Sequence, residues 1–144
     1  MILYLDTSAL VKAYFTEAFT PIILSKIEEA DTVSSHVITF VETHATFARL
    51  QREGKINETQ LITLKREFIA DWENYLQISM LPALILRAAE FAEAFALRAY
   101  DSVHLAAVEH LQKSTKQSVE FACFDHRLNQ AAKILGISLI TNEH

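Results

Sequence analysis

The side chains with the greatest capacity for chemistry in this chain are four carboxylates: Asp6, Glu42, Asp101 and Asp125. Asp6 directly follows the apolar run Ile2-Leu3-Tyr4-Leu5, and Asp125 directly follows Phe121-Ala122-Cys123-Phe124. Each run is typical of a buried strand. The carboxyl ends of parallel strands share one edge of a sheet, and ligands of open α/β sheets bind at that edge. The pattern therefore predicts that distant acids meet in one cleft.

Each of these acids also has a purely structural interpretation. Aspartate is a favoured N-cap because its side chain accepts a hydrogen bond from the first turn of a helix. Asp6, Asp101 and Asp125 all stand where we expect helices to begin. Glu42 lies inside a predicted helix and caps nothing, but it is also explained as a surface charge paired with Arg49.

The four acids taken together favour a metal site. Carboxylates crowded into one pocket repel each other, which raises the pKa of at least one of them and resists full ionisation. A divalent cation removes that conflict, and an all-oxygen ligand set selects Mg²⁺ or Mn²⁺ over zinc. Such an ion polarises a phosphodiester and activates water.

The elements that must position these acids alternate along the chain. Apolar periodicity and turn residues predict strands over 2–5, 32–35, 76–80, 118–124 and 137–140. They predict helices over 7–15, 21–30, 36–52, 57–75, 82–97, 101–112 and 126–135, with Gly54 ending one and Asn57 capping the next. This alternation indicates an α/β domain with a parallel sheet covered on both faces. We expect one domain over 1–144.

The amino-acid composition further limits the class of protein to which this chain can belong. The 144 residues are 51% hydrophobic and include one cysteine, which suits a single core in a reducing compartment; we expect a cytoplasmic protein with no membrane association. Two glycines exclude the glycine-rich phosphate loops. The net charge of −5 argues against the basic footprint of a passive nucleic-acid binder, although a metal-loaded acidic site still attracts phosphate.

Four segments together carry a family resemblance. They are Leu5-Asp6-Thr7-Ser8-Ala9-Leu10-Val11-Lys12, Glu42 in the third helix, Arg98-Ala99-Tyr100-Asp101-Ser102-Val103-His104-Leu105-Ala106 and Phe124-Asp125-His126-Arg127-Leu128. In order and spacing, over essentially the whole chain, they resemble the PIN domain, and most of all the VapC toxins of bacterial type II toxin–antitoxin pairs.

The resemblance implies a PIN-like three-layer α/β/α fold, with about seven helices around a mostly parallel sheet of four or five strands. It implies an endoribonuclease that uses Mg²⁺ or Mn²⁺ held by the acidic quartet, with Asp6 and Asp101 touching the metal directly. Thr7 or Ser8 would bond within the site or to a phosphate. A cognate antitoxin would fill the cleft, and the toxin would form a homodimer. Among the basic residues near the acids, Arg49 and Arg98 are the candidates for contacts with RNA phosphates.

Two departures from the family pattern stand out. Family members often carry a glycine in the turn after the first helix, where this chain has Glu17-Ala18-Phe19-Thr20. A threonine or serine commonly lies two residues before the last aspartate, where this chain has Cys123. A thiol is a weak hydrogen-bonding partner, so we expect a contact to Asp125 or to substrate to be lost.

Alternatives remain for several of these residues. A PIN-like module that binds RNA or protein without cutting would keep the fold, although such modules are marked by lost acids and none is lost here. A haloacid-type phosphatase also begins with a strand-end aspartate, but it needs a second acid where this chain has Ser8. Cys123 is interpreted as a buried inert thiol, and Phe68 and Trp72 as core or dimer contacts rather than a base-stacking platform.

Overall fold

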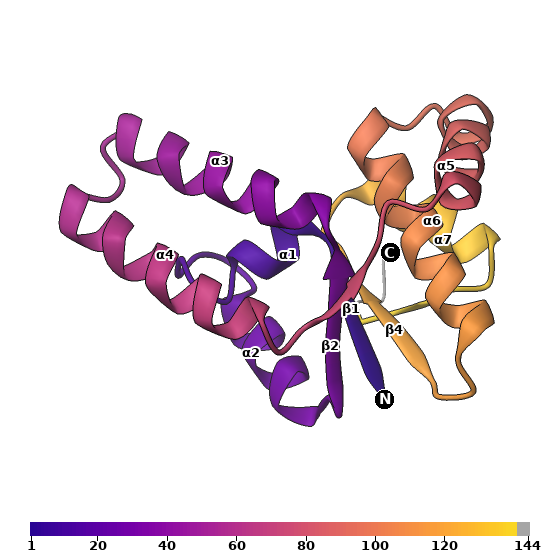
Figure 1. Ribbon diagram of the computed structural model, residues 1–144, viewed down its shortest axis with the longest axis horizontal. Coiled ribbons are helices and arrows are strands. Elements are labelled where there is room, and N and C mark those ends of the chain that lie inside the picture. The colour runs from indigo at the N-terminus through magenta and orange to yellow at the C-terminus, as the bar shows by residue number, and fades with distance from the viewer. Residues whose placement is uncertain (141–144) are drawn as a thin grey trace.

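A five-stranded, entirely parallel sheet forms the middle layer of the computed structural model, which describes residues 1–140 (Figure 1). The last four residues of the predicted domain, 141–144, lie outside the described part. The strands run in the order β3-β2-β1-β4-β5. Their bounds are β1 (Ile2–Leu5), β2 (Thr32–His36), β3 (Leu76–Ile78), β4 (Val119–Ala122) and β5 (Ser138–Leu139).

Helices cover both faces of this sheet and complete the predicted three-layer α/β/α fold. Seven helices lie within residues 1–140: α1 (Thr7–Val11), α2 (Thr20–Glu29), α3 (Ile38–Arg52), α4 (Glu58–Trp72), α5 (Pro82–Phe95), α6 (Ala99–Ser114) and α7 (His126–Ile134). The first four helices lie on one side of the strands in Figure 1 and α5, α6 and α7 on the other.

The alternation of side chains along β1 builds two separate cores. Leu3 and Leu5 belong to the cluster under α1–α4, whereas Ile2 and Tyr4 belong to the cluster under α5–α7. Successive side chains of a strand point to opposite faces, so a fully apolar strand packs on both. Phe68 and Trp72 lie in the first cluster, which confirms their interpretation as core residues.

The register of the central strands fixes the location of the acids. Leu5 of β1 lies beside Ala122 of β4, and the N–H of Asp6 donates to the carbonyl of Ala122 at 3.1 Å. The connection after β1 leads to β2 on one side, while β4 returns on the other side. The crevice between β1 and β4 is therefore the topological switch point, where ligands of open α/β sheets bind. Asp6 and Asp125 follow these two strands.

Several predicted helix boundaries were wrong, and two of them affect residues next to the acids. The first helix, expected over 7–15, ends at Val11 because the chain continues in tighter turns, with the N–H of Lys12 donating to Ala9 and that of Ala13 to Leu10. The helix expected to begin at Asp101 begins at Ala99. Asp101 therefore lies in the first turn, where a negative charge still stabilises the positive end of the helix, but it is not the cap.

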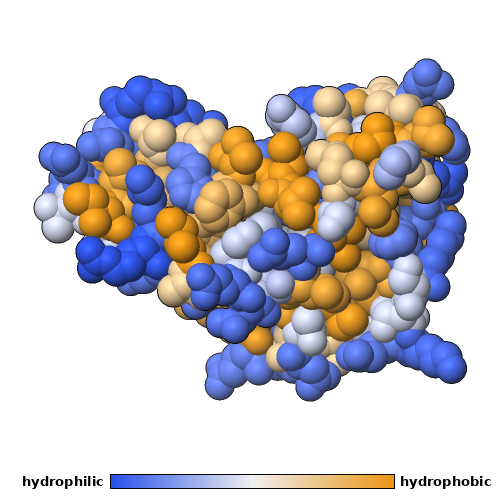
Figure 2. Space-filling model, in the orientation of Figure 1, coloured by the Kyte–Doolittle hydropathy of each residue, from blue (hydrophilic) through white to orange (hydrophobic). Residues whose placement is uncertain are grey.

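An antiparallel pair of helices, α3 and α4, projects from one side of the sheet as an arm (Figure 1). As predicted, Gly54 ends the first of them with a positive φ of 75°, and Asn57 caps the second by accepting from the N–H of Gln60 at 2.8 Å. The surface is notched between this arm and the α5–α7 side (Figure 2). Within the described residues, no helix combines the length and the apolar character that spanning a membrane requires.

Candidate active site

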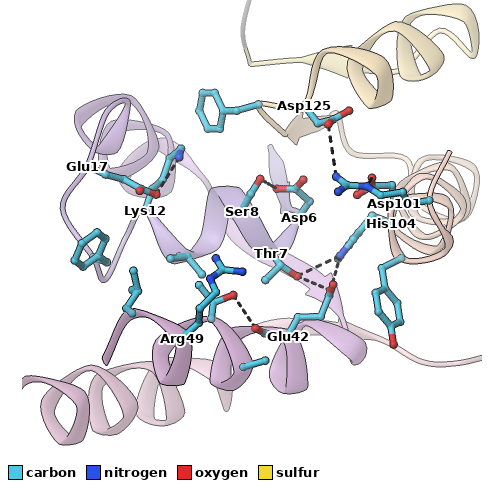
Figure 3. A pocket seen from close by; sticks show the side chains of 18 of the residues that line it. Asp6, Thr7, Ser8, Lys12, Glu17, Glu42, Arg49, Asp101, His104 and Asp125 are labelled. Carbon is cyan, nitrogen blue, oxygen red and sulfur yellow. Dashed lines mark hydrogen bonds and ion pairs between the residues drawn. The ribbon is translucent and has the colours of Figure 1, made fainter. Parts of the chain in front are cut away.

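A hollow of about 780 Å³ lies at the carboxyl edge of the sheet, and all four predicted acids line it. In Figure 3, Asp6 lies near the centre, Glu42 on the α3 side, Asp101 on the α6 side and Asp125 on the α7 side. The other predicted site residues also line the hollow: Thr7, Ser8, Arg49 and Arg98. The structure therefore brings together every residue that the sequence nominated.

Asp6 is buried at the end of β1 and is both an N-cap and a member of the acidic group. Its Oδ1 accepts from the N–H of Ala9 and from the hydroxyl of Ser8, each at 2.9 Å. Burial raises the pKa of the Asp6 carboxyl, and the neighbouring His104 together with these hydrogen bonds opposes the rise only in part. Asp6 is thus a buried carboxylate whose negative charge is only partly offset by its protein surroundings.

Glu42 is held by donors from two other elements rather than by Arg49. Its Oε1 accepts from the hydroxyl of Thr7 at 2.6 Å and lies 3.0 Å from Nε2 of His104. Burial alone would raise the pKa of Glu42, but the hydrogen bonds from His104 and Thr7 outweigh burial and keep the pKa below its ordinary value. The alternative interpretation of Glu42 as a surface charge paired with Arg49 is therefore wrong.

His104 is the site residue that sequence reasoning missed. It is buried on α6, one turn after Asp101, with its Nδ1 2.8 Å from the hydroxyl of Tyr4 and its Nε2 3.3 Å from the hydroxyl of Thr7. An ionised carboxylate only accepts hydrogen bonds, so Nε2 carries the hydrogen that points to Glu42. The available signal was a histidine inside the apolar run of α6, spaced to lie on the same helix face as Asp101.

The other two acids share one cation. Nε of Arg98 donates to Oδ2 of Asp101 at 3.2 Å, and Nη2 of Arg98 lies 3.8 Å from Oδ2 of Asp125. Asp125 also caps α7, because its Oδ1 accepts from the N–H of Leu128 at 2.9 Å. The Arg98 side chain is 83% exposed, so it can leave this position at little cost.

Cys123 interacts with Asp125 despite being a thiol. It is fully buried, and its Sγ accepts from the backbone N–H of Asp125 at 3.3 Å. The expectation that this contact is lost was therefore wrong, because a sulfur atom can accept where a hydroxyl would. Burial and the nearby Asp6 raise the pKa of the thiol, which keeps it neutral and unreactive.

The donor set of the hollow fits a hard divalent cation. Its acidic ligands are all carboxylates, the chemistry that Mg²⁺ and Mn²⁺ prefer. Between Asp101 and Asp125 the structure already places a positive charge, the guanidinium of Arg98. Over residues 1–140, no three His, Cys, Asp or Glu side chains are grouped closely enough to hold an ion as they stand. As the structure stands, Asp101 and Asp125 are paired with Arg98, and Glu42 is bonded to His104 and Thr7.

Arg49 and Arg98 are expected to behave differently when each is replaced by glutamine. Within the described residues, the Arg49 guanidinium has no ion pair, and it extends into the hollow (Figure 3), so Arg49→Gln should weaken the binding of a phosphate-bearing ligand there. Arg98→Gln removes the cation that competes for Asp101 and Asp125, and should tighten Mn²⁺ binding by up to about fivefold. Calorimetric titrations with a phosphate-bearing ligand and with Mn²⁺ measure the two effects. Unchanged Mn²⁺ affinity in Arg98→Gln would contradict this interpretation.

Comparisons with known proteins agree with this geometry. The sequence matches the family model of the PIN domain over residues 3–134. It is 26% identical over 135 residues to ribonucleases VapC45 and VapC49 from two strains of Mycobacterium tuberculosis, covering 94% of this chain and 92% of each relative.

Solved structures share the fold over nearly the whole chain. FitAB bound to an IR36 DNA fragment aligns with a TM-score of 0.69 and 16% identity, covering 100% of this chain and 99% of that one. A toxin–antitoxin complex from Klebsiella pneumoniae aligns with a TM-score of 0.68 and 12% identity, covering 98% and 99%. At these identities the likeness concerns the fold alone.

Proposed function

Because the chain belongs to the PIN domain family, we propose that it is a metal-dependent endoribonuclease and the toxin of a toxin–antitoxin pair. The observation that carries the proposal is the convergence of Asp6, Glu42, Asp101 and Asp125 on one hollow at the switch point of the sheet. These residues come from four separate elements, and caps alone would not require them to meet.

In this proposal Asp6, Asp101 and Asp125 hold one or two ions, and Glu42 binds metal or positions water. A bound Mg²⁺ or Mn²⁺ would polarise a phosphodiester of the RNA and activate a water molecule. The low pKa of Glu42 favours orienting a water molecule over removing its proton. Burial raises the pKa of Asp6, and a cation beside it would lower that pKa and stabilise the ionised carboxylate. Arg49 holds a phosphate of the strand, and Arg98 moves from the acids to the RNA.

The proposed partners follow from the relatives and from the surface. The relatives are named ribonucleases and a structural neighbour is a toxin–antitoxin complex, which supports RNA as substrate and a cognate antitoxin as inhibitor. The cytoplasm is the compartment that we propose for this pair. Exposed apolar side chains gather near the start of α5, among them Met80, Leu81, Ile85 and Leu86. Figure 2 shows hydrophobic surface running across this face. We assign that surface to a homodimer contact.

The purified protein is expected to cut total RNA with Mg²⁺ or Mn²⁺ and to lose this activity in EDTA, because the carboxylates alone repel the phosphate backbone. Gel analysis of the RNA, with added Mn²⁺ as the rescue, measures the effect. RNA binding without cleavage would replace the proposal by a non-catalytic PIN-like module. Hydrolysis of a simple phosphomonoester but not of RNA would replace it by a phosphatase.

A further inference from the structure

An aromatic pair flanks the acidic hollow on the side of Asp125. The rings of Phe19 and Phe124 are stacked, with centroids 5.0 Å apart and planes within 10° of each other. Phe124 is adjacent to Asp125 and lines the hollow, and Nζ of Lys12 lies 5.1 Å from its ring centroid. Phe19 extends the pair away from the hollow and is 51% exposed.

The backbone of Phe19 holds this ring outward under strain. Phe19 has φ 70°, in the left-handed region that favours glycine, and it precedes α2 without making a side-chain cap. The loop around it is fixed, because the Thr20 hydroxyl donates to the carbonyl of Lys12 at 2.9 Å and accepts from the N–H of Glu17 at 3.0 Å. Strain at a surface aromatic is retained where the surrounding structure enforces it, and such positions cluster at functional sites.

We propose that the outer face of Phe19 is a stacking site for a nucleobase of the RNA strand as it leaves the hollow past Asp125. The inference rests on the proposed function and specifies how that site holds its substrate. A nucleobase on Phe19 extends the existing stack by one ring, and aromatic stacking of this kind accepts every base. Lys12, which is paired with Glu17 at 3.0 Å, lies beside the same stack and can contact the adjoining phosphate.

The chemistry of this surface favours a nucleic acid over an apolar protein segment. The exposed ring of Phe19 is flat and already stacked on Phe124, and the cationic side chain of Lys12 lies over the Phe124 ring. It also continues directly from the wall of the hollow in which the phosphodiester would be cut.

The test separates the contribution of the bases to RNA binding from that of the sugar–phosphate backbone. Binding is measured by fluorescence anisotropy in Ca²⁺, in an Asp101→Asn background that prevents cleavage. The two probes are fluorescein-labelled oligoadenylate of 12 nucleotides and an abasic strand of equal length. Phe19→Ala should weaken oligoadenylate binding about tenfold and leave abasic binding unchanged, because stacking contributes on this scale per base.

Matched variants separate recognition from folding. Phe19→Gly should lose the same affinity as Phe19→Ala and yet melt at a higher temperature, because glycine accepts the left-handed backbone. Phe19→Trp should retain the preference for oligoadenylate. Ile62→Ala removes an equally exposed apolar side chain of α4 and should have no effect.

The outcomes distinguish this inference from the proposed function. If Phe19→Ala keeps its preference for oligoadenylate, or loses affinity for both probes equally, the stacking site is refuted and the aromatic pair is left to a protein partner. If the wild-type protein neither binds nor cuts RNA with Mg²⁺, the proposed function fails first. Cleavage by wild type with no dependence on Phe19 refutes the stacking site alone.

Discussion

Asp6→Asn is expected to abolish RNA cleavage while raising the free energy of unfolding of the metal-free protein. Asparagine is as good an N-cap as aspartate, so the hydrogen bond from the N–H of Ala9 is kept. The substitution removes one carboxylate from the proposed metal site, which should lower kcat at least about 10³-fold. A loss of activity in a more stable protein cannot be attributed to misfolding.

The stability gain follows from the sign of the pKa shift. Burial raises the pKa of Asp6 in the folded state, so the folded protein binds this proton more tightly than the unfolded chain does. The stability linked to that proton is fully present below the ordinary aspartate pKa and is lost as pH rises through the raised value. At neutral pH in EDTA, Asp6→Asn should therefore be more stable than the wild-type protein, because asparagine carries no charge to desolvate.

Urea denaturation in EDTA at several pH values measures this effect. The difference in stability between wild type and Asp6→Asn should grow as pH rises and disappear in acid. Asp31→Asn is the matched control, because Asp31 is exposed and its hydrogen bond from the N-terminal amine lowers its pKa. That variant should keep full cleavage activity and gain no stability. An active Asp6→Asn protein would refute the assignment of the site.

The strand ends were predictable because they depend on local patterns. Apolar runs followed by an aspartate marked the ends of β1 and β4, and parallel pairing then required Asp6 and Asp125 to lie at one edge. Helix boundaries depend on less local features. The start of α6 at Ala99 depends on Ala96, which ends α5 in a left-handed conformation at φ 52°, and nothing in the composition of that segment marks it.

Side-chain partners across elements could not be predicted in the same way. The sequence nominated Arg98 for RNA, whereas the structure places it between Asp101 and Asp125, because the turn before α6 points it back over both acids. The sequence places His104 only inside a predicted helix, whereas its partners are Tyr4 and Glu42 on other elements. In the sequence, Phe19 was notable only because it lies in a turn where family members often carry a glycine. Its stacking on Phe124 depends on how that turn packs in the folded protein.

His104→Phe is expected to lower kcat by about 10–100-fold with little change in KM for RNA. His104 borders the hollow, but its side chain is almost fully buried, and it acts through Glu42, which it holds at 3.0 Å. Outer partners of metal-ligating carboxylates typically contribute on this scale. Phenylalanine fills the buried space but leaves Glu42 with only the Thr7 hydroxyl, so the carboxylate can rotate away from the hollow.

Variants at the same network separate positioning from a loss of packing. His104→Gln retains an N–H that can reach Glu42 and should recover much of the activity, whereas a purely structural role would not distinguish the two substitutions. Tyr4→Phe removes the hydroxyl that fixes the imidazole through Nδ1 and should cause a smaller loss of the same kind. His110→Phe, at an exposed position of α6, is the control. Calorimetry should show weaker Mn²⁺ binding by His104→Phe. This variant should also melt at a lower temperature, because the buried hydroxyl of Tyr4 loses its partner. Full kcat in His104→Phe would mean that Glu42 needs no fixed orientation.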